Sequence, residues 1–269
     1  MSSIFRSSIL TVLLVAASAA VAGAQAPTLP FDHIHLNVPA PADAAAWYET
    51  HMGGTRITEA PDRLVFGSTR LAFTAKADAA PSQGSAVDHI GFSFPDLDAK
   101  MKAFEAAGIK IVSPIRDVAG LFKLAFIEDP WGTRIEVVQD DELLGLHHIH
   151  MRGPNPDEVL TWLVDKFGGS RQKLKGRNEA VRYDVEGFSS VWFLVQAGEA
   201  TPTQGRAIDH IGWRSTGPLA ATIDGLRSKQ VTVAAEPQGL TMPNGALVNY
   251  AYVDGPNGTR IEMVERPKE

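Results

Sequence analysis

The sequence predicts an α+β protein made of four similar modules, each with a strand, a helix and about three further strands. The main observation is an internal duplication. Residues 86–92 (AVDHIGF) recur as residues 207–213 (AIDHIGW), and GTRIE occurs at 132–136 and again at 258–262. Residues 31–35 (FDHIH) are echoed by residues 146–150 (LHHIH). Ordered matches of this kind indicate that a structural unit has been copied.

Each half of the chain is itself doubled, because a segment of the type Asp/His-His-Ile opens at residues 31, 87, 146 and 208. Each module contains a stretch that begins at Pro or Asp or ends at Gly, which predicts a helix there. Alternating apolar residues predict strands between them. The predicted helices span 44–51, 96–107, 158–167 and 217–229, and the clearest strands span 63–66, 71–73, 124–127 and 190–194. The predicted domains are residues 29–141 and 145–266, with two modules each.

Residues 1–24 are interpreted as a secretory signal peptide with cleavage after Ala24. A short segment with one positive charge precedes an apolar stretch, and Ala22-Gly23-Ala24 is a small-residue cleavage site. The alternative is an uncleaved membrane anchor, which the short, Ala- and Ser-rich stretch disfavours. We therefore expect an exported protein, periplasmic or secreted, without stable membrane association after cleavage.

Composition excludes several classes of function. The chain has no Cys, which rules out disulfides, thiolate ligands and cysteine nucleophiles. A net charge of −6 without a basic cluster disfavours nucleic acid as a partner. No glycine-rich phosphate loop is present. A small-molecule substrate is the expected partner.

Histidines and glutamates recur on separate apolar, strand-like segments, where alternate residues share a face. If Ile90 packs against helices, His89 points to the concave face of its sheet. A Glu within an apolar strand is costly unless it is paired or coordinated. Two His and one carboxylate suit a divalent metal with open positions, and Fe, Mn, Zn and Ni all remain possible. The candidate metal ligands are His33, His89, Glu136, His148, His210 and Glu262.

Two simpler interpretations of these residues stay open. Each His can be a hydrogen-bonded core residue, and Glu136 and Glu262 can pair with Arg134 and Arg260. The tryptophans of the predicted helices, Trp47 and Trp162, are expected in the core.

Three further residues are candidate catalytic groups. His35 and His150 follow presumed ligands by two positions and therefore share their strand face. They can act in proton transfer or substrate contact, or simply form the cavity wall. Tyr252 lies on a strand preceding Glu262 and can reach the cavity.

These motifs resemble the vicinal oxygen chelate superfamily, which includes glyoxalase I, extradiol dioxygenases and bleomycin-resistance proteins. The resemblance rests on the four module openings, on residues 129–136 (DPWGTRIE) and on their copy at 254–262 (DGPNGTRIE). It implies four βαβββ modules paired into two curled mixed-sheet half-barrels, each around a metal. Sequential pairing would join His33, His89 and Glu136, then His148, His210 and Glu262. Swapped pairing would join His33, His210 and Glu262, then His148, His89 and Glu136.

The resemblance implies metal-dependent chemistry on a small substrate that chelates through adjacent oxygens, with lyase, isomerase or dioxygenase activity. Extradiol dioxygenases normally add an acid–base His that this chain lacks between His150 and Glu262, apart from His210 itself. One alternative is a non-catalytic module that sequesters a small ligand, as bleomycin-resistance proteins do. Another is a purely structural metal, which an incomplete three-ligand sphere disfavours. Either a monomer or a homodimer is compatible with the duplication.

Overall fold

The computed structural model describes residues 27–58, 60–242 and 245–267. The predicted signal peptide, with its cleavage site after Ala24, lies outside the described residues. Within the described part of the chain, no helix has the length and apolar character needed to cross a membrane.

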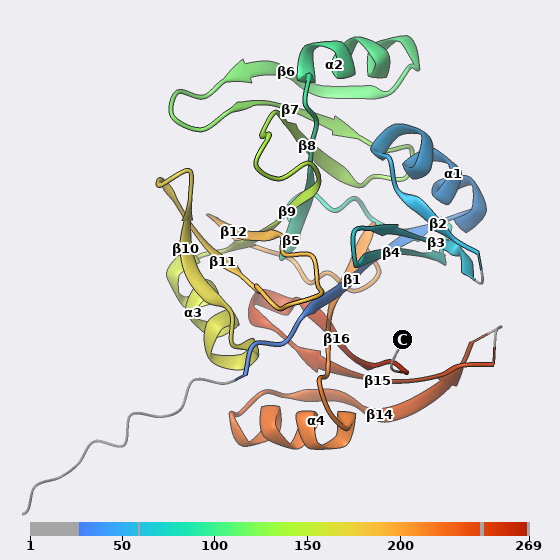
Figure 1. Ribbon diagram of the computed structural model, residues 1–269, viewed down its shortest axis with the longest axis vertical. Coiled ribbons are helices and arrows are strands. Elements are labelled where there is room, and N and C mark those ends of the chain that lie inside the picture. Colours follow the sequence, from blue (N-terminus) through green and yellow to red (C-terminus); the bar gives the residue numbers. More distant parts are fainter. Residues whose placement is uncertain (1–26, 59, 243–244, 268–269) are drawn as a thin grey trace, which may run out of the picture.

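The four predicted modules are all present, each with one helix and four strands (Figure 1). Module 1 contains β1 (Phe31–Val38), α1 (Pro41–Met52), β2 (Thr55–Ile57), β3 (Ala60–Phe66) and β4 (Thr69–Ala75). Module 2 contains β5 (Val87–Ser93), α2 (Leu97–Ala106), β6 (Lys110–Asp117), β7 (Lys123–Glu128) and β8 (Arg134–Val138). Module 3 contains β9 (Gly145–Gly153), α3 (Pro156–Phe167), β10 (Ser170–Leu174), β11 (Asn178–Arg182) and β12 (Trp192–Ala197). Module 4 contains β13 (Ile208–Arg214), α4 (Leu219–Ser228), β14 (Val233–Thr241), β15 (Leu247–Asp254) and β16 (Arg260–Glu265), with a 3₁₀ turn at Pro256–Gly258.

The helix punctuation follows the sequence. Helices α1 and α3 each begin with a proline, whose missing N–H costs nothing in the first turn. Both end at a glycine in the left-handed region, Gly53 with φ 81° and Gly168 with φ 75°. Helix α2 starts after Asp96, whose carboxylate accepts a hydrogen bond from Ala99 N at 2.9 Å.

The sheets combine modules from opposite halves of the chain. Sheet I has the strand order β14-β15-β16-β13-β1-β4-β3-β2 and joins module 1 to module 4. Sheet II has the order β10-β11-β12-β9-β5-β8-β7-β6 and joins module 2 to module 3. The central contacts are antiparallel, between β1 and β13 in sheet I and between β5 and β9 in sheet II. The sequence left two pairings open, and the structure has the swapped one.

One apolar core lies behind both sheets. The isoleucines that alternate with the candidate ligands, Ile34, Ile90, Ile149 and Ile211, are fully buried in it. The core crosses between the sheets, because the Phe31 ring of β1 packs on the Phe193 ring of β12 at 5.0 Å. The histidine faces are therefore the concave ones, as predicted. Trp47 and Trp162 pack against the same core but remain partly exposed.

The pairing generates a first prediction about separated halves. Fragments 27–142 and 143–267 each lack the partner strands of both their sheets, so neither is expected to unfold cooperatively as a monomer. Co-expressed, they should purify together in a 1:1 complex, measured by gel filtration and thermal circular dichroism. A monomeric 27–142 fragment with a sharp melting transition would contradict the swapped pairing.

Candidate metal centres

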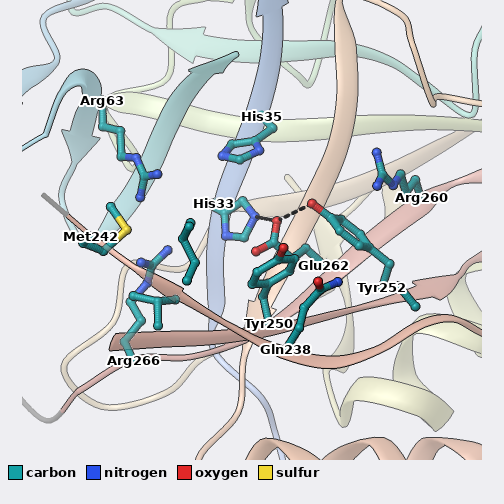
Figure 2. A pocket seen from close by; sticks show the side chains of 13 residues that line it. His33, His35, Arg63, Gln238, Met242, Tyr250, Tyr252, Arg260, Glu262 and Arg266 are labelled. Carbon is teal, nitrogen blue, oxygen red and sulfur yellow. Dashed lines mark hydrogen bonds and ion pairs between the residues drawn. The ribbon is translucent and has the colours of Figure 1, made fainter. Parts of the chain in front are cut away.

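Strands β1, β13 and β16, which are neighbours in sheet I, bring three of the predicted ligands together. Figure 2 shows two of them, His33 and Glu262. The Nε2 atoms of His33 and His210 lie 3.5 and 2.9 Å from Oε2 of Glu262. All three side chains are buried. Ligand atoms that each sit about 2.1 Å from one metal ion are about 3.0–3.4 Å apart, so this spacing suits coordination. We call this cluster site I.

A glycine makes the approach of these strands possible. Gly212 lies opposite His33 in the β1–β13 pair, and the His33 ring lies directly over it. A Cβ at Gly212 would be 2.1 Å from His33 Cε1, closer than any real contact. The glycine of the Asp-His-Ile-Gly motif is therefore needed to seat a ligand of the neighbouring strand.

Each ligand histidine is oriented by the aspartate that precedes it. His33 Nδ1 lies 2.8 Å from Asp32 Oδ1, and His210 Nδ1 lies 2.7 Å from Asp209 Oδ1. An ionised carboxylate only accepts, so Nδ1 must donate and Nε2 keeps a lone pair in the neutral ring. Carboxylates commonly orient metal-ligating histidines in this way.

With both rings neutral, the lone pairs of the two histidine Nε2 atoms face a carboxylate oxygen, which is also a hydrogen-bond acceptor. His33 Nε2 and His210 Nε2 both face Glu262 Oε2, and only a cation between them makes the arrangement favourable. Without a metal, a proton on the imidazole has to supply the positive charge. Burial alone lowers the pKa of His33, but Glu262 and Asp32 outweigh burial and raise that pKa. Burial alone raises the pKa of Glu262, but His33 and His210 hold it well below its usual range. His33 Nε2 is buried and makes no hydrogen bond to the described residues. The donor set therefore fits a divalent metal.

Site I opens into a cavity of about 460 Å³. Its lining combines the cluster with polar and charged groups from β3, β14 and β15 and with a few apolar side chains (Figure 2). The lining residues are His33, His35, Arg63, Ala235, Gln238, Leu240, Met242, Val248, Tyr250, Tyr252, Arg260, Glu262 and Arg266. Space for a small polar molecule thus adjoins the ligand atoms.

Two of the candidate catalytic residues line this cavity. The His35 ring lies 4.3 Å from the His210 ring, measured between centroids. Burial, followed by the charges of His210 and His33, lowers the pKa of His35 well below its usual value. Tyr252 donates a hydrogen bond to Glu262 Oε2 at 3.2 Å, and burial with the Glu262 charge raises its pKa. His35 is thus a neutral base, and Tyr252 a protonated donor.

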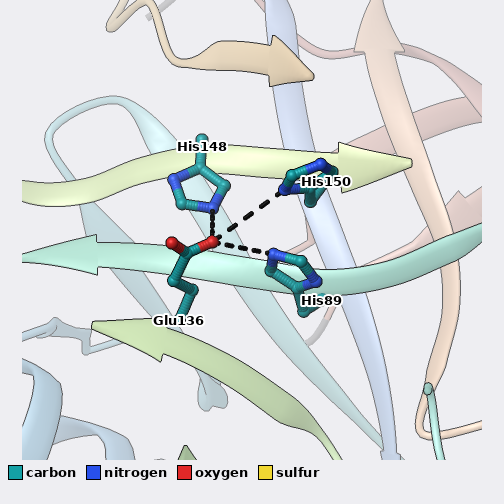
Figure 3. A group of neighbouring side chains, drawn as sticks. All are labelled: His89, Glu136, His148 and His150. Carbon is teal, nitrogen blue, oxygen red and sulfur yellow. Dashed lines mark hydrogen bonds and ion pairs between the residues drawn. The ribbon is translucent and has the colours of Figure 1, made fainter. Parts of the chain in front are cut away.

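The other ligands form an equivalent cluster, site II, on β5, β8 and β9 of sheet II (Figure 3). The Nε2 atoms of His89 and His148 lie 3.0 and 3.2 Å from Glu136 Oε2. His150, the third candidate catalytic residue, turns its Nδ1 toward the same oxygen at 3.9 Å. The His148 ring lies over Gly91, as the His33 ring lies over Gly212. A Cβ at Gly91 would be 2.0 Å from His148 Cε1.

The two sites differ in what surrounds them. Phe126 stands opposite Glu136, where Tyr252 stands opposite Glu262. Beyond His150 the same row of sheet II continues with Leu194 and Ala180. Beyond His35, sheet I has Ala72 and Arg63. Phe126, Leu194 and Ala180 belong to one apolar cluster of buried residues in sheet II.

Several functional contacts were not foreseen from sequence. Arg134 and Arg260 do not pair with the glutamates but with Asp88 at 3.2 Å and Asp209 at 3.0 Å. The supporting role of the aspartates was missed, although an Asp precedes the His at three of the four module openings. Arg63 gave no sequence signal, because its place in the cavity depends on the pairing of β3.

Comparison with known proteins supports the fold. Residues 31–137 match the family model of the glyoxalase/bleomycin resistance protein/dioxygenase superfamily. Glyoxalase I from Zea mays superposes with a TM-score of 0.69 at 14% identity, covering 88% of this chain and 92% of that one. A putative dioxygenase from Bacillus subtilis gives 0.60 at 17% identity, covering 90% and 86%.

The resemblance to the vicinal oxygen chelate superfamily is confirmed. A lactoylglutathione lyase of Pseudomonas aeruginosa is 45% identical over 51 residues, which is 19% of this chain and 28% of that protein. The match thus spans about a quarter of that curated relative. The solved structures are 14% and 17% identical to this chain, so they show a shared fold, the vicinal oxygen chelate fold with two mixed sheets.

The glycines give a matched pair of tests. Gly212→Ala should displace the His33 ring and remove about one equivalent of bound metal from site I. Gly91→Ala should displace the His148 ring and remove about one equivalent from site II. Both variants should keep the far-UV circular dichroism of the parent, because the clash is with a ring edge. Gly225→Ala in α4, where a Cβ meets nothing within 4 Å, is the control. Full metal content in Gly212→Ala would contradict the geometry of site I.

Proposed function

We propose that this protein is an exported, divalent-metal-dependent enzyme of the vicinal oxygen chelate superfamily, with site I as its active site. The observation that supports this most strongly is the convergence of His33, His210 and Glu262, two of which, His33 and Glu262, line a cavity. Three protein ligands leave coordination positions for a substrate. Fe, Mn, Zn or Ni suits the donors.

The proposed substrate is a small molecule with two adjacent oxygens. A divalent metal held by His33, His210 and Glu262 would supply Lewis acidity to those oxygens, which acidifies the neighbouring C–H bond. His35 is the proposed proton acceptor, since it lines the cavity and its ring lies 4.3 Å from the His210 ring. Tyr252 holds Glu262 in position through its hydroxyl hydrogen bond. Proton transfer of this kind favours lyase or isomerase chemistry over ring cleavage.

Arg63 is the proposed contact for the far end of the substrate. It lies in the same row as His35, separated from it only by the small Ala72. Its Nε is buried without a hydrogen bond to the described residues, and its nearest carboxylate, Asp62, is 3.8 Å away and half exposed. Arg266, by contrast, donates to the buried Asp32 at 2.6 Å. A substrate with an anionic group away from its chelating oxygens would satisfy Arg63.

The signal-like sequence of residues 1–24 supports export. Amino-terminal sequencing of the protein recovered from the periplasm or medium of an expressing bacterium should begin at Gln25. Retention in the cytoplasm with Met1 intact would reject the export proposal and leave the site I proposal untouched.

The active-site assignment is tested by metal content and turnover together. Glu262→Gln should lose metal from site I and lose activity by at least a hundredfold, because one ligand and its charge are gone, while thermal unfolding stays cooperative. Glu136→Gln is the matched control and should keep turnover at site I. Metal is measured by elemental mass spectrometry of the mature protein purified without chelators or a His tag.

Two results would reject this assignment. If the mature protein takes up none of the four metals, the sequestering-module alternative replaces the enzyme. If Glu136→Gln abolishes turnover and Glu262→Gln does not, the active site is site II.

The anion contact predicts selective binding. Metal-loaded protein should bind 2-hydroxyglutarate more tightly than 2-hydroxyvalerate, which chelates identically but lacks the second carboxylate. Arg63→Ala should remove that preference, a loss of roughly tenfold or more since a charged hydrogen bond contributes about 1.5–3 kcal/mol. Arg56→Ala, which removes an exposed ion pair with Glu49 and a long hydrogen bond to Pro61 O, is the control. Equal calorimetric affinities in the parent would contradict the role of Arg63.

A further inference from the structure

Site II places a third histidine, His150, beside its two histidine ligands and its glutamate, much as His35 lies beside His33 and His210 in site I. Candidate donor atoms of His89, Glu136, His148 and His150 all lie within 4.8 Å of one another (Figure 3). Glu136 Oε2 is their common neighbour, at 3.0, 3.2 and 3.9 Å from the three histidine nitrogens. Three imidazoles and one carboxylate form a complete tetrahedral set for Zn²⁺.

Two of these buried donors face Glu136 without a hydrogen bond. Neither His148 Nε2 nor His150 Nδ1 makes a hydrogen bond to the described residues. An unsatisfied buried polar atom costs about 1–3 kcal/mol. A cation coordinated by both nitrogens and by Glu136 removes that cost.

A hydrogen-bond relay prepares His148 for coordination. Lys175 Nζ lies 2.7 Å from Asp140 Oδ1, and Asp140 Oδ2 lies 3.2 Å from His147 Nε2. The carboxylate only accepts, so His147 donates from Nε2 and accepts at Nδ1 from His148 Nδ1 at 2.8 Å. The lone pair of His148 is thereby left on Nε2, facing Glu136. Asp88 fixes His89 in the same sense at 2.8 Å.

The surroundings of site II are more apolar than those of site I. Phe126 takes the place of Tyr252, and Leu194 and Ala180 take the places of Ala72 and Arg63. All three belong to one apolar cluster. His150 also lines a cavity of about 460 Å³ beside α3 and β11.

We propose that site II binds a structural Zn²⁺ through His89, Glu136, His148 and His150, and takes no substrate. The ligands come from β5 and β8 of module 2 and from β9 of module 3, so the ion links the two halves of the chain. Metal binding at such a site adds directly to the stability of the folded state. This inference concerns a different cluster from the proposed active site and can fail independently of it.

The test uses the mature protein carrying Glu262→Gln together with His33→Gln, because His33, His35 and His210 could otherwise still hold an ion at site I. Loaded with Co²⁺, it should show the intense visible absorption of a four-coordinate ion, and azide or oxalate should leave that spectrum unchanged. Loaded with Zn²⁺, it should retain about one equivalent after dialysis against EDTA and melt at a higher temperature than the metal-free protein.

Adding His150→Ala to this background should weaken zinc binding at least tenfold and lower the melting temperature of the zinc form toward that of the metal-free form. His35→Ala in the same background is the matched control and should change neither. A Co²⁺ spectrum that shifts on adding azide, or zinc affinity and melting temperature unaffected by His150→Ala, would overturn the proposal. So would the absence of any bound metal in the protein carrying Glu262→Gln and His33→Gln. The melting curve of each metal-free variant shows whether it is folded. Loss of the fold is thereby distinguished from loss of zinc binding.

Discussion

Both metal centres depend on one backbone contact, the antiparallel pairing of β1 with β13 and its copy between β5 and β9. The pairing sets two histidines from different modules side by side, with the ring of one lying over a glycine of the other strand. The parallel neighbour then brings a glutamate alongside that glycine, Glu262 beside Gly212 and Glu136 beside Gly91. A shift of this register by one residue would move every donor side chain to the core face of its sheet. The chemistry of the molecule is therefore a property of strand register.

The modules and the donors could be predicted from sequence because both are written in local patterns. Strand alternation placed His89 opposite Ile90, and proline and glycine marked the ends of α1 and α3. Pairing could not be predicted, since the two copies carry the same motifs and either partner buries the same apolar face. The choice depends on packing between distant segments, such as Phe31 against Phe193. Arg63 was missed for the same reason, because it reaches site I only through strands β3 and β4.

The aspartates show a different limit of sequence reasoning. Strand alternation puts Asp32 and Asp209 on the face opposite to their histidines, which argues against any contact with the imidazoles. In the structure the register shifts next to His33, and each carboxylate reaches the Nδ1 of the following ring. Burial raises the pKa of Asp32, but the hydrogen bond with His33 and the charge and hydrogen bonds of Arg266 hold it well below the usual range. Arg214 donates to the same carboxylate. An irregular strand thus converts an unfavourable position into support for a ligand.

Duplication gives each copy freedom to change while the other keeps its role. The scaffold needs both clusters of donors to be neutralised, since each places buried imidazole acceptors against a carboxylate. It needs only one of them to admit a substrate. Tyr252 and Arg63 line a cavity at the first site, whereas Phe126 and Leu194 belong to an apolar cluster at the second. A closed centre binds its ion more firmly than an open one because no coordination position is shared with water. The same donor pattern can accordingly serve reactivity in one sheet and stability in the other.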